Sequence, residues 1–439
     1  MVRKLFPVLL LTFVNVIGFS LLIPVLPGIV EQYAPPEYAG VLYGALLSSY
    51  AIFQFLAAPL LGSLSDRFGR RPLLFLSQLG TLLSWVIFGS AYFMPDWNIF
   101  GIALPLYVIA FSRVTDGITG GNVSVANAWI ADSTTKEEKT HAFGIIGATF
   151  GIGFLVGPAL GGISSSLGLG YLGTCILAFI ISLITLIIIE FYLPESLPKE
   201  KRDHTVDLHI GRQLNIIKKF AAFKNNLLVS RILMLRLSFT LAFSGYVTII
   251  ILYLKNAFSL SPTGLGIALS LIGVFSIINQ ALVVRKVVQK IGSVHTLYLG
   301  LGLVVLGLLM LPLLPTTLPP LTFLPGGLGK YSSGLILVMI NAFIMNLGIG
   351  LSGPNFKSLL ANAVEDTKQG AITGLDESLM ALGNAITPML AGALFALIGA
   401  TTFALFAVFL VLPVAYFYFA TGVVLPLTVA AKNQQASHS

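Results

Sequence analysis

The chain has 439 residues, of which 56% are hydrophobic and only 10% are charged, and its formal net charge is +8. These charges are too few to cover a water-soluble protein of this length, so that class is excluded. Nucleic acid is not an expected partner, because the basic residues lie between apolar runs and do not cluster on one soluble face. The single cysteine, Cys175, excludes a disulfide within the chain and a cysteine metal site.

Apolar runs recur along the whole chain, each long enough to cross a bilayer as a helix. They are too long and too continuously apolar for the strands of a barrel, the other structure that satisfies backbone groups in lipid. The predicted fold is therefore an all-α membrane protein with twelve transmembrane helices in two six-helix pseudo-repeat bundles. The expected spans are residues 5–30, 40–62, 73–94, 99–131, 141–165, 169–193, 226–254, 262–287, 294–314, 334–361, 370–396 and 400–424.

Lysine and arginine lie almost entirely on one side of these spans, and the opposite side holds only Lys255 and Lys330. This asymmetry predicts that both termini are cytoplasmic. The longest polar stretch lies near the middle of the chain and indicates a cytoplasmic linker, within which residues 208–223 have amphipathic character and are expected on the membrane surface. The predicted domains are an N-terminal bundle (1–193), the linker (194–225), a C-terminal bundle (226–424) and a cytoplasmic tail (425–439).

The loop that follows the second span, from Gly62 to Pro72, reads GSLSDRFGRRP. Its glycines allow a tight turn, Asp66 suits a helix N-terminus, and its arginines can hold carboxylates of other helices, with Asp132 as one partner. The loop resembles the signature loop of the major facilitator superfamily at nearly every position. A positive-inside anchor alone would explain the arginines but not the spacing of the glycines and the aspartate. The residues assigned to a conformational switch are Gly62, Asp66, Arg67, Gly69, Arg70, Arg71 and Asp132.

Residues 151–162 in the fifth span read GIGFLVGPALGG, with glycines four residues apart that suit close helix packing. Together with the PVLP segment at 24–27, they resemble the exporter signature of twelve-helix drug–proton antiporters, in particular the tetracycline-exporter branch. The resemblance covers most of the N-terminal half and is weaker beyond it. Packing without export specificity stays an alternative. The exporter-motif residues are Gly153, Gly157, Pro158, Gly161 and Gly162.

Two departures from the tetracycline exporters concern proton coupling. Asn15 in the first span and Ser84 in the third stand where those exporters carry aspartates. Neither side chain exchanges protons at physiological pH. The departures argue against tetracycline as the substrate and against the usual coupling site of the branch.

Charged residues inside the spans are the alternative proton sites, because each costs about 2.5–3.5 kcal/mol on insertion scales. Arg113 and Asp116 share one face of the fourth span. We expect Asp116 to replace the missing carboxylates; the alternative is an ion pair that only neutralises itself. Asp376 and Glu377 near the start of the eleventh span are further proton-coupling candidates, although favourable placement at a helix N-terminus also explains them.

Neutral polar, aromatic and basic side chains within the spans are candidates for a substrate cavity, with interhelical hydrogen bonding as the alternative. Arg236 could bind an anionic substrate or pair with one of the carboxylates of the eleventh span. The cavity candidates are Asn15, Gln54, Arg113, Asn122, Arg236, Tyr246 and Asn341.

The sequence shows no hydrolase triad, phosphate loop or metal cluster, so we expect no enzyme activity, cofactor or metal. The predicted function is proton-coupled export of small organic compounds, drugs or metabolites, by alternating access. The expected partners are substrate, protons and the lipid bilayer of the inner (plasma) membrane, and the family resemblance implies a monomer. The alternatives are an importer or facilitator with the same fold and a non-transporting membrane receptor or scaffold.

Overall fold

The structure, a computed structural model, describes residues 2–134, 136–202, 223, 226–316, 333–364 and 369–421. The chain forms two compact units, one of Met1–Leu214 with Leu260–Gly273 and the other of Asn215–Ser259 with Val274–Ser439. Most of the predicted linker, its amphipathic segment up to residue 222 and the predicted tail at 425–439 lie outside the described residues.

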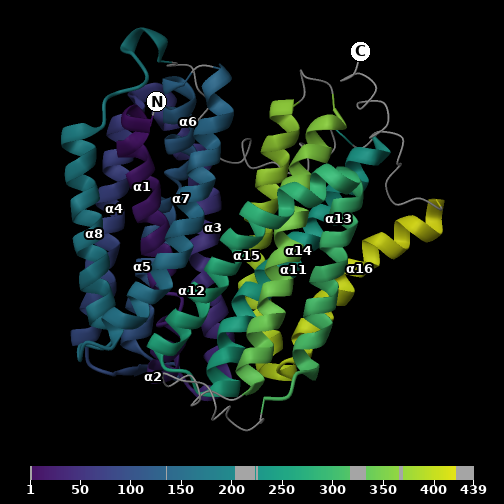
Figure 1. The fold of residues 1–439 in the computed structure, drawn as a ribbon. Helices are drawn as coiled ribbons and strands as arrows, with labels where there is room; N and C mark the ends of the chain where they lie inside the picture. Colours follow the sequence, from purple (N-terminus) through teal and green to yellow (C-terminus); the bar gives the residue numbers. More distant parts are fainter. Residues whose placement is uncertain are drawn as a thin grey trace. The chain divides into compact units, whose positions relative to one another are not determined.

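The helices of the first unit are labelled in Figure 1, and two of its apolar runs are each broken into two helices. The first break, between α1 and α2, bends the run by 41°. The second lies between α5 and α6, at Gly121 and Asn122. Proline and glycine are tolerated in membrane helices when neighbouring helices satisfy the freed backbone groups. The helices are α1 (Val2–Leu21), α2 (Leu26–Tyr33), α3 (Pro36–Phe68), α4 (Arg70–Ser90), α5 (Leu104–Gly120), α6 (Val123–Ser133), α7 (Lys136–Ser165) and α8 (Tyr171–Tyr192).

In the second half of the chain, α12 contributes its first residues, up to Gly273, to the first unit. A π-helical turn at Asn279–Val284 follows α12, and Gly292 kinks α13 with a φ of 76°. The helices are α11 (Leu227–Phe258), α12 (Pro262–Ile278), α13 (Arg285–Met310), α14 (Ser333–Asn362), α15 (Gln369–Ile398) and α16 (Thr401–Thr421).

Within the described ranges, nine helices are long and apolar enough to cross a membrane, or ten if the bent pair α1 and α2 counts as one span. The predicted all-α membrane fold is confirmed, whereas the count of twelve spans stays a prediction. One boundary was wrong: the expected fourth span began at residue 99, but residues 98–103 form a hairpin of β1 (Asn98–Ile99) and β2 (Ile102–Ala103), and α5 begins at Leu104. Phe100 and Gly101 have positive φ values of 51° and 84°, which a helix cannot accommodate.

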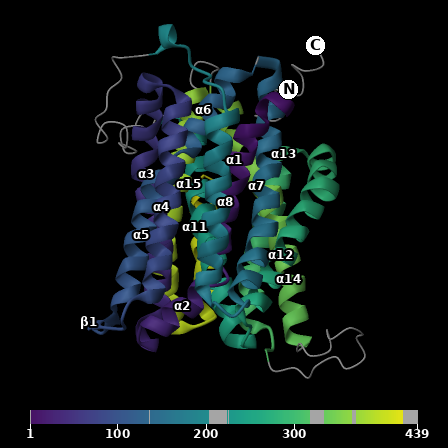
Figure 2. The ribbon, with the colours of Figure 1, turned by 90° about the vertical axis from the view of Figure 1, so that its left-hand side faces the viewer.

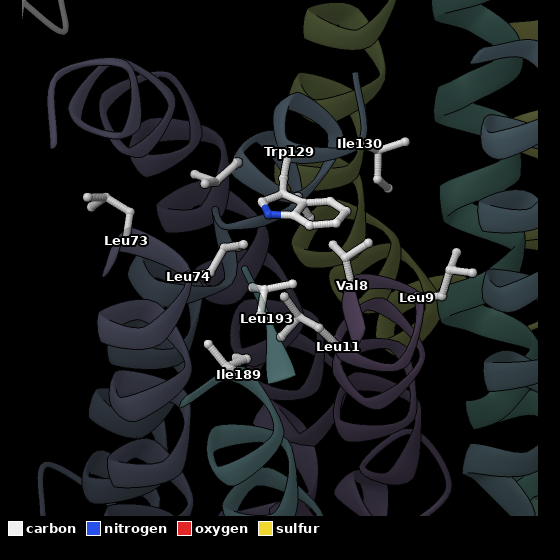
Figure 3. Close-up of a cluster of buried hydrophobic side chains, with 11 residues drawn as sticks. Val8, Leu9, Leu11, Leu73, Leu74, Trp129, Ile130, Ile189 and Leu193 are labelled. Carbon is white, nitrogen blue, oxygen red and sulfur yellow. The ribbon is translucent and has the colours of Figure 1, made fainter. Parts of the chain in front are cut away.

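A cluster of buried aliphatic side chains surrounds Trp129 of α6 in the first unit (Figure 3). Val8 and Leu11 of α1 and Leu74 of α4 are all fully buried in it. The indole Nε1 donates a hydrogen bond of 2.8 Å to the carbonyl oxygen of Pro194, just beyond α8. The cluster therefore fixes α6 and the exit of α8 against α1 and α4, next to the signature loop between α3 and α4.

Candidate functional site

Arg113 and Asp116 form a buried ion pair on α5. The Nη2 atom of Arg113 lies 3.1 Å from the Oδ2 atom of Asp116, and the two side chains are only 3% and 8% exposed. The guanidinium carbon lies 5.3 Å from the ring centroid of Trp85, 5.4 Å from that of Phe88 and 5.9 Å from that of Tyr50. Ring faces attract cations, so one carboxylate and three aromatic rings together stabilise the buried charge.

Ser84 of α4 faces the carboxylate of Asp116. Ser112, on the preceding turn of α5, donates a hydrogen bond of 2.8 Å to the carbonyl oxygen of Ser84, so the two helices are in direct contact there. The resemblance to the tetracycline exporters implies an aspartate at the position of Ser84. The carboxylate of Asp116 therefore lies beside Ser84 but belongs to the neighbouring helix.

A ladder of hydroxyl groups continues this contact one turn further along α4 and α5. The hydroxyls of Thr81 and Thr119 lie 3.2 Å apart, and Ser77 donates to the carbonyl oxygen of Thr119. Gly80 leaves the space that the methyl group of Thr119 occupies, because a side chain at residue 80 would overlap it. The polar contacts between α4 and α5 therefore continue from Asp116 toward the end of the unit where the signature loop lies.

Three cavity candidates of the first unit meet at the break between α5 and α6. The amide of Asn15 donates a hydrogen bond of 3.1 Å to the side-chain oxygen of Asn122. The amide of Gln54 donates to the carbonyl oxygen of Gly120 at 3.0 Å and to the hydroxyl of Tyr50 at 3.2 Å. These bonds connect α1 and α3 to the break, where a helical carbonyl would otherwise have no partner.

A second buried ion pair joins α11 and α15 in the second unit. The Nε atom of Arg236 lies 2.8 Å from Oδ1 of Asp376, with a longer contact of 3.5 Å from Nη2 to Oδ2. The side chains are 3% and 2% exposed, and the guanidinium also lies over the rings of Phe239 and Phe356. Arg236 was expected either to bind an anionic substrate or to pair with a carboxylate of the eleventh span. The structure shows the pair, with Asp376.

Glu377 lies in a different environment, although it is adjacent to the buried carboxylate in sequence. It pairs with Lys357 of α14 at 2.7 Å, and both side chains are 54% exposed. The other two cavity candidates of this unit are buried among helices. Tyr246 lies beside the ring of Phe403, and Asn341 donates a hydrogen bond of 3.0 Å to the carbonyl oxygen of Gly307.

Arg70 is the centre of the signature loop. Its Nη1 atom lies 2.6 Å from Asp66, and its Nε atom donates to Asp132 at 3.0 Å, which is the partner that the sequence suggested. The expected place of Asp66 at a helix N-terminus was wrong, because it lies in the last turn of α3. Its neighbour Arg71 pairs with Glu190 of α8 at 3.3 Å. Arg67 makes no such bridge in the described residues and lies over the ring of Phe68 instead. The loop thus joins α3, α4, α6 and α8 through charged groups.

Glu195, which sequence reasoning placed in the linker without a role, caps the N-terminus of α4. Its Oε1 atom accepts a hydrogen bond of 2.9 Å from the backbone N–H of Arg70, and Oε2 accepts one of 3.3 Å from Arg71. Arg202 lies 3.6 Å from the same carboxylate, and Gly69, with a φ of 104°, leaves room for both side chains. Because the contact joins residues 125 positions apart, no local pattern signals it.

The glycines of the exporter motif pack α7 against α1. Side chains at Gly153, Gly157 and Gly161 would overlap Val16, Ser20 and the backbone of Leu21, respectively. The hydroxyl of Ser20 also donates to the carbonyl oxygen of Gly153 at 3.2 Å. The close packing expected from the four-residue spacing is present, and it accounts for these glycines whether or not they also determine the direction of transport.

The other face of the motif contacts the first turns of α12. Thr263 donates a hydrogen bond of 3.0 Å to the carbonyl oxygen of Gly162, and Ser270 donates one of 2.6 Å to that of Leu155. A side chain at Gly266 would overlap the carbonyl of Pro158. Both helices therefore approach at backbone distance, and hydroxyl groups bond carbonyls that the proline and glycines leave accessible.

Comparison with known proteins gives one family. A sequence model of the Major Facilitator Superfamily matches residues 8–329. The chain is 27% identical to the class C tetracycline resistance protein of Escherichia coli, over 87% of each chain, and 28% identical to the class H protein of Pasteurella multocida, over 88% of each. Multidrug resistance protein 2 of Bacillus subtilis is 28% identical, over 87% of this chain and 86% of its own.

Solved structures share the fold. The human organic anion transporter MFSD10 (TETRAN) superimposes with a TM-score of 0.66 at 24% sequence identity, over 94% of this chain and 98% of its own. A D-xylose–proton symporter superimposes with a TM-score of 0.69 at 16% identity, over 96% and 98%. At these identities the likeness concerns the fold alone.

Proposed function

Because this chain belongs to the Major Facilitator Superfamily, it is a multi-pass membrane transporter, and we propose that it exports small organic compounds in exchange for protons. The relatives that support export include tetracycline and multidrug resistance proteins, which match over more than four-fifths of the chain. The asymmetry of lysine and arginine supports an inner (plasma) membrane location with both termini in the cytoplasm.

The proposed substrate is a small organic compound other than tetracycline, either a drug or a secreted metabolite. Asn15 and Ser84 replace two aspartates of the tetracycline-exporter pattern, and Asn15 is bonded to another neutral amide, that of Asn122. Asn15 is neutral, and the charge of Asp116 beside Ser84 is offset by Arg113, so this region attracts cationic compounds less strongly than one with two free carboxylates. These substitutions therefore favour neutral or anionic compounds.

Proton coupling is assigned to Asp116, and the observation that carries this assignment is its position against Ser84. A proton on Asp116 removes the charge that pairs with Arg113, which then keeps, among the described residues, its contacts with the aromatic rings. The proton and the guanidinium thus compete for one carboxylate. Any step that moves Arg113 away from Asp116 favours proton uptake, and a step that restores the pair favours release, which links protonation to alternating access.

The alternatives differ in the flux that they predict. An importer or facilitator with this fold raises the amount of substrate inside cells, and a receptor or scaffold produces no flux. If the ion pair of Arg113 and Asp116 only neutralises two buried charges, the proton site lies elsewhere, with Asp376 as the next candidate because it forms the corresponding buried pair.

The proposal is tested by the accumulation of labelled drugs, dyes and organic acids in efflux-deficient cells that express the protein. Lower accumulation than in cells with the empty vector, reversed by a protonophore, supports proton-driven export. Higher accumulation contradicts export and indicates uptake. Unchanged accumulation across a broad panel, with the protein verified in the membrane, favours the receptor or scaffold.

A further inference from the structure

The hairpin between α4 and α5 exposes large aromatic side chains. Its strands pair Asn98 with Ala103 and Ile99 with Ile102, and its turn has positive φ values at both central residues, Phe100 and Gly101. Glycine or asparagine is the usual choice for the first of these positions. A phenylalanine there has a strained backbone, and it is 97% exposed. An exposed ring at this position is open to contact with a partner.

Other exposed apolar side chains lie in the segment that leads to this tip. Phe93 is 73% exposed, Trp97 is 68% exposed and Ile99 is 38% exposed. Between Pro72 and Ser112, Asp96 is the only charged residue. We call Phe93, Trp97, Ile99 and Phe100 the aromatic hairpin cluster. Exposed apolar side chains concentrated in one short segment indicate contact with another apolar phase.

Hydrogen bonds hold the hairpin in a fixed direction. The hydroxyl of Tyr107, in the first turn of α5, donates a hydrogen bond of 2.9 Å to the carbonyl oxygen of Ile99. The backbone N–H of Leu104 donates one of 2.8 Å to the carbonyl oxygen of Trp97. Figure 2 shows β1 projecting sideways from the end of α5, away from the helices of the first unit. The hairpin therefore points outward from the side of the unit and not along the helix axes.

The cluster continues the exposed apolar faces of the two helices that it joins. On α4, Leu76, Leu83 and Val86 are 59%, 51% and 50% exposed, and the candidate span that includes this helix ends at Phe93. On α5, Phe111 is 61% exposed, one turn after Tyr107. Apolar faces of membrane spans contact lipid, so the hairpin lies where this lipid-facing surface reaches the edge of the bilayer.

We propose that the aromatic hairpin cluster inserts into the interfacial layer of the surrounding bilayer and anchors the ends of α4 and α5 there. Aromatic rings, and tryptophan above all, are stabilised at this depth, where one part of the side chain is in apolar surroundings and a polar part is hydrated. Asp96 is the only charged residue near the cluster in sequence, which is consistent with contact with lipid. The partner is a lipid surface, and no second protein is required.

The positions of the tryptophans make a direct test possible. Trp85 and Trp129 are 1% and 0% exposed, whereas Trp97 is 68% exposed. The full chain is reconstituted into phosphatidylcholine vesicles that carry bromine either near the headgroup end or near the methyl end of the acyl chains. The difference in fluorescence between the unchanged protein and Trp97→Phe isolates the signal of Trp97. We expect shallow bromine to quench this signal more strongly than deep bromine or aqueous iodide.

A second variant tests the cluster without removing the reporter. Phe100→Asn places a residue that tolerates positive φ at the turn, so the hairpin itself is preserved. We expect quenching by shallow bromine to fall toward the level measured for Trp97→Phe, which lacks the reporter. Quenching of Trp97 by iodide should rise. The proposal is overturned if Trp97 is quenched by iodide but not by brominated lipid, or if Phe100→Asn leaves both quenching profiles unchanged.

Discussion

Replacement of Glu195 tests whether the charged cluster at the signature loop depends on the cap of α4. The carboxylate accepts hydrogen bonds from the backbone N–H groups of Arg70 and Arg71 and lies 3.6 Å from Arg202. It therefore places a negative charge at the positive end of the helix dipole, beside a basic side chain. Glu195→Gln keeps one acceptor oxygen and removes the charge, while Glu195→Ala removes both.

The magnitude follows from these contacts. A charge at a helix N-terminus contributes about 0.3–1 kcal/mol, and loss of a capping side chain costs about 0.5–2 kcal/mol. The Glu195 side chain is 26% exposed, so water screens its charge only in part. We expect the free energy of unfolding to fall by about 1 kcal/mol for the glutamine variant and about 2 kcal/mol for the alanine variant.

The assay is the unfolding transition of the purified protein in one detergent. The matched control is Glu200→Gln, which makes the same charge change on an exposed residue of the short 3₁₀ helix Lys199–Lys201. We expect the control to unfold like the unchanged protein. Equal stability of Glu195→Gln and the unchanged protein, or an equal loss in the control, would refute the capping role.

Three further changes have expected results. Gly161→Ala forces a methyl group against the backbone of Leu21 and should lower stability by about 1–3 kcal/mol, measured by thermal unfolding, whereas Gly151→Ala, which meets no atom within 4 Å, should not. Asp376→Asn leaves Arg236 buried without a counter-ion and should cost about 3–5 kcal/mol, most of it regained when Arg236→Gln is added. Glu377→Gln breaks an exposed pair and should change stability by less than about 1 kcal/mol in the same assay.

Apolar runs predict the helices of this chain because lipid offers no other partner for the backbone. The span expected at residues 169–193, for example, contains α8 at Tyr171–Tyr192. The breaks in helices are harder to foresee, since glycine and asparagine occur both at the break between α5 and α6 and inside continuous helices. The hairpin was missed for a similar reason: Ile99, Phe100 and Ile102 are as apolar as a membrane helix.

In the site, contacts between residues close in sequence could be predicted, whereas contacts between distant residues could not. The i, i+3 spacing of Arg113 and Asp116 is enough to suggest the ion pair that the structure contains. The contact between Ser84 and Asp116 depends on how α4 packs against α5, and the cap by Glu195 joins the ends of two distant helices. Neither leaves a periodic signal, so both require the structure.

The central claim is that Asp116 carries the transported proton. The decisive measurement is flux of a compound identified in the accumulation assay, in proteoliposomes with and without an imposed pH gradient, for the unchanged protein, Asp116→Asn and the double variant Arg113→Gln/Asp116→Asn. The double variant leaves no unpaired charge, so it separates coupling from folding. We expect it to exchange substrate at equal pH but to lose gradient-driven flux; gradient-driven flux at the unchanged rate would show that the pair only neutralises itself.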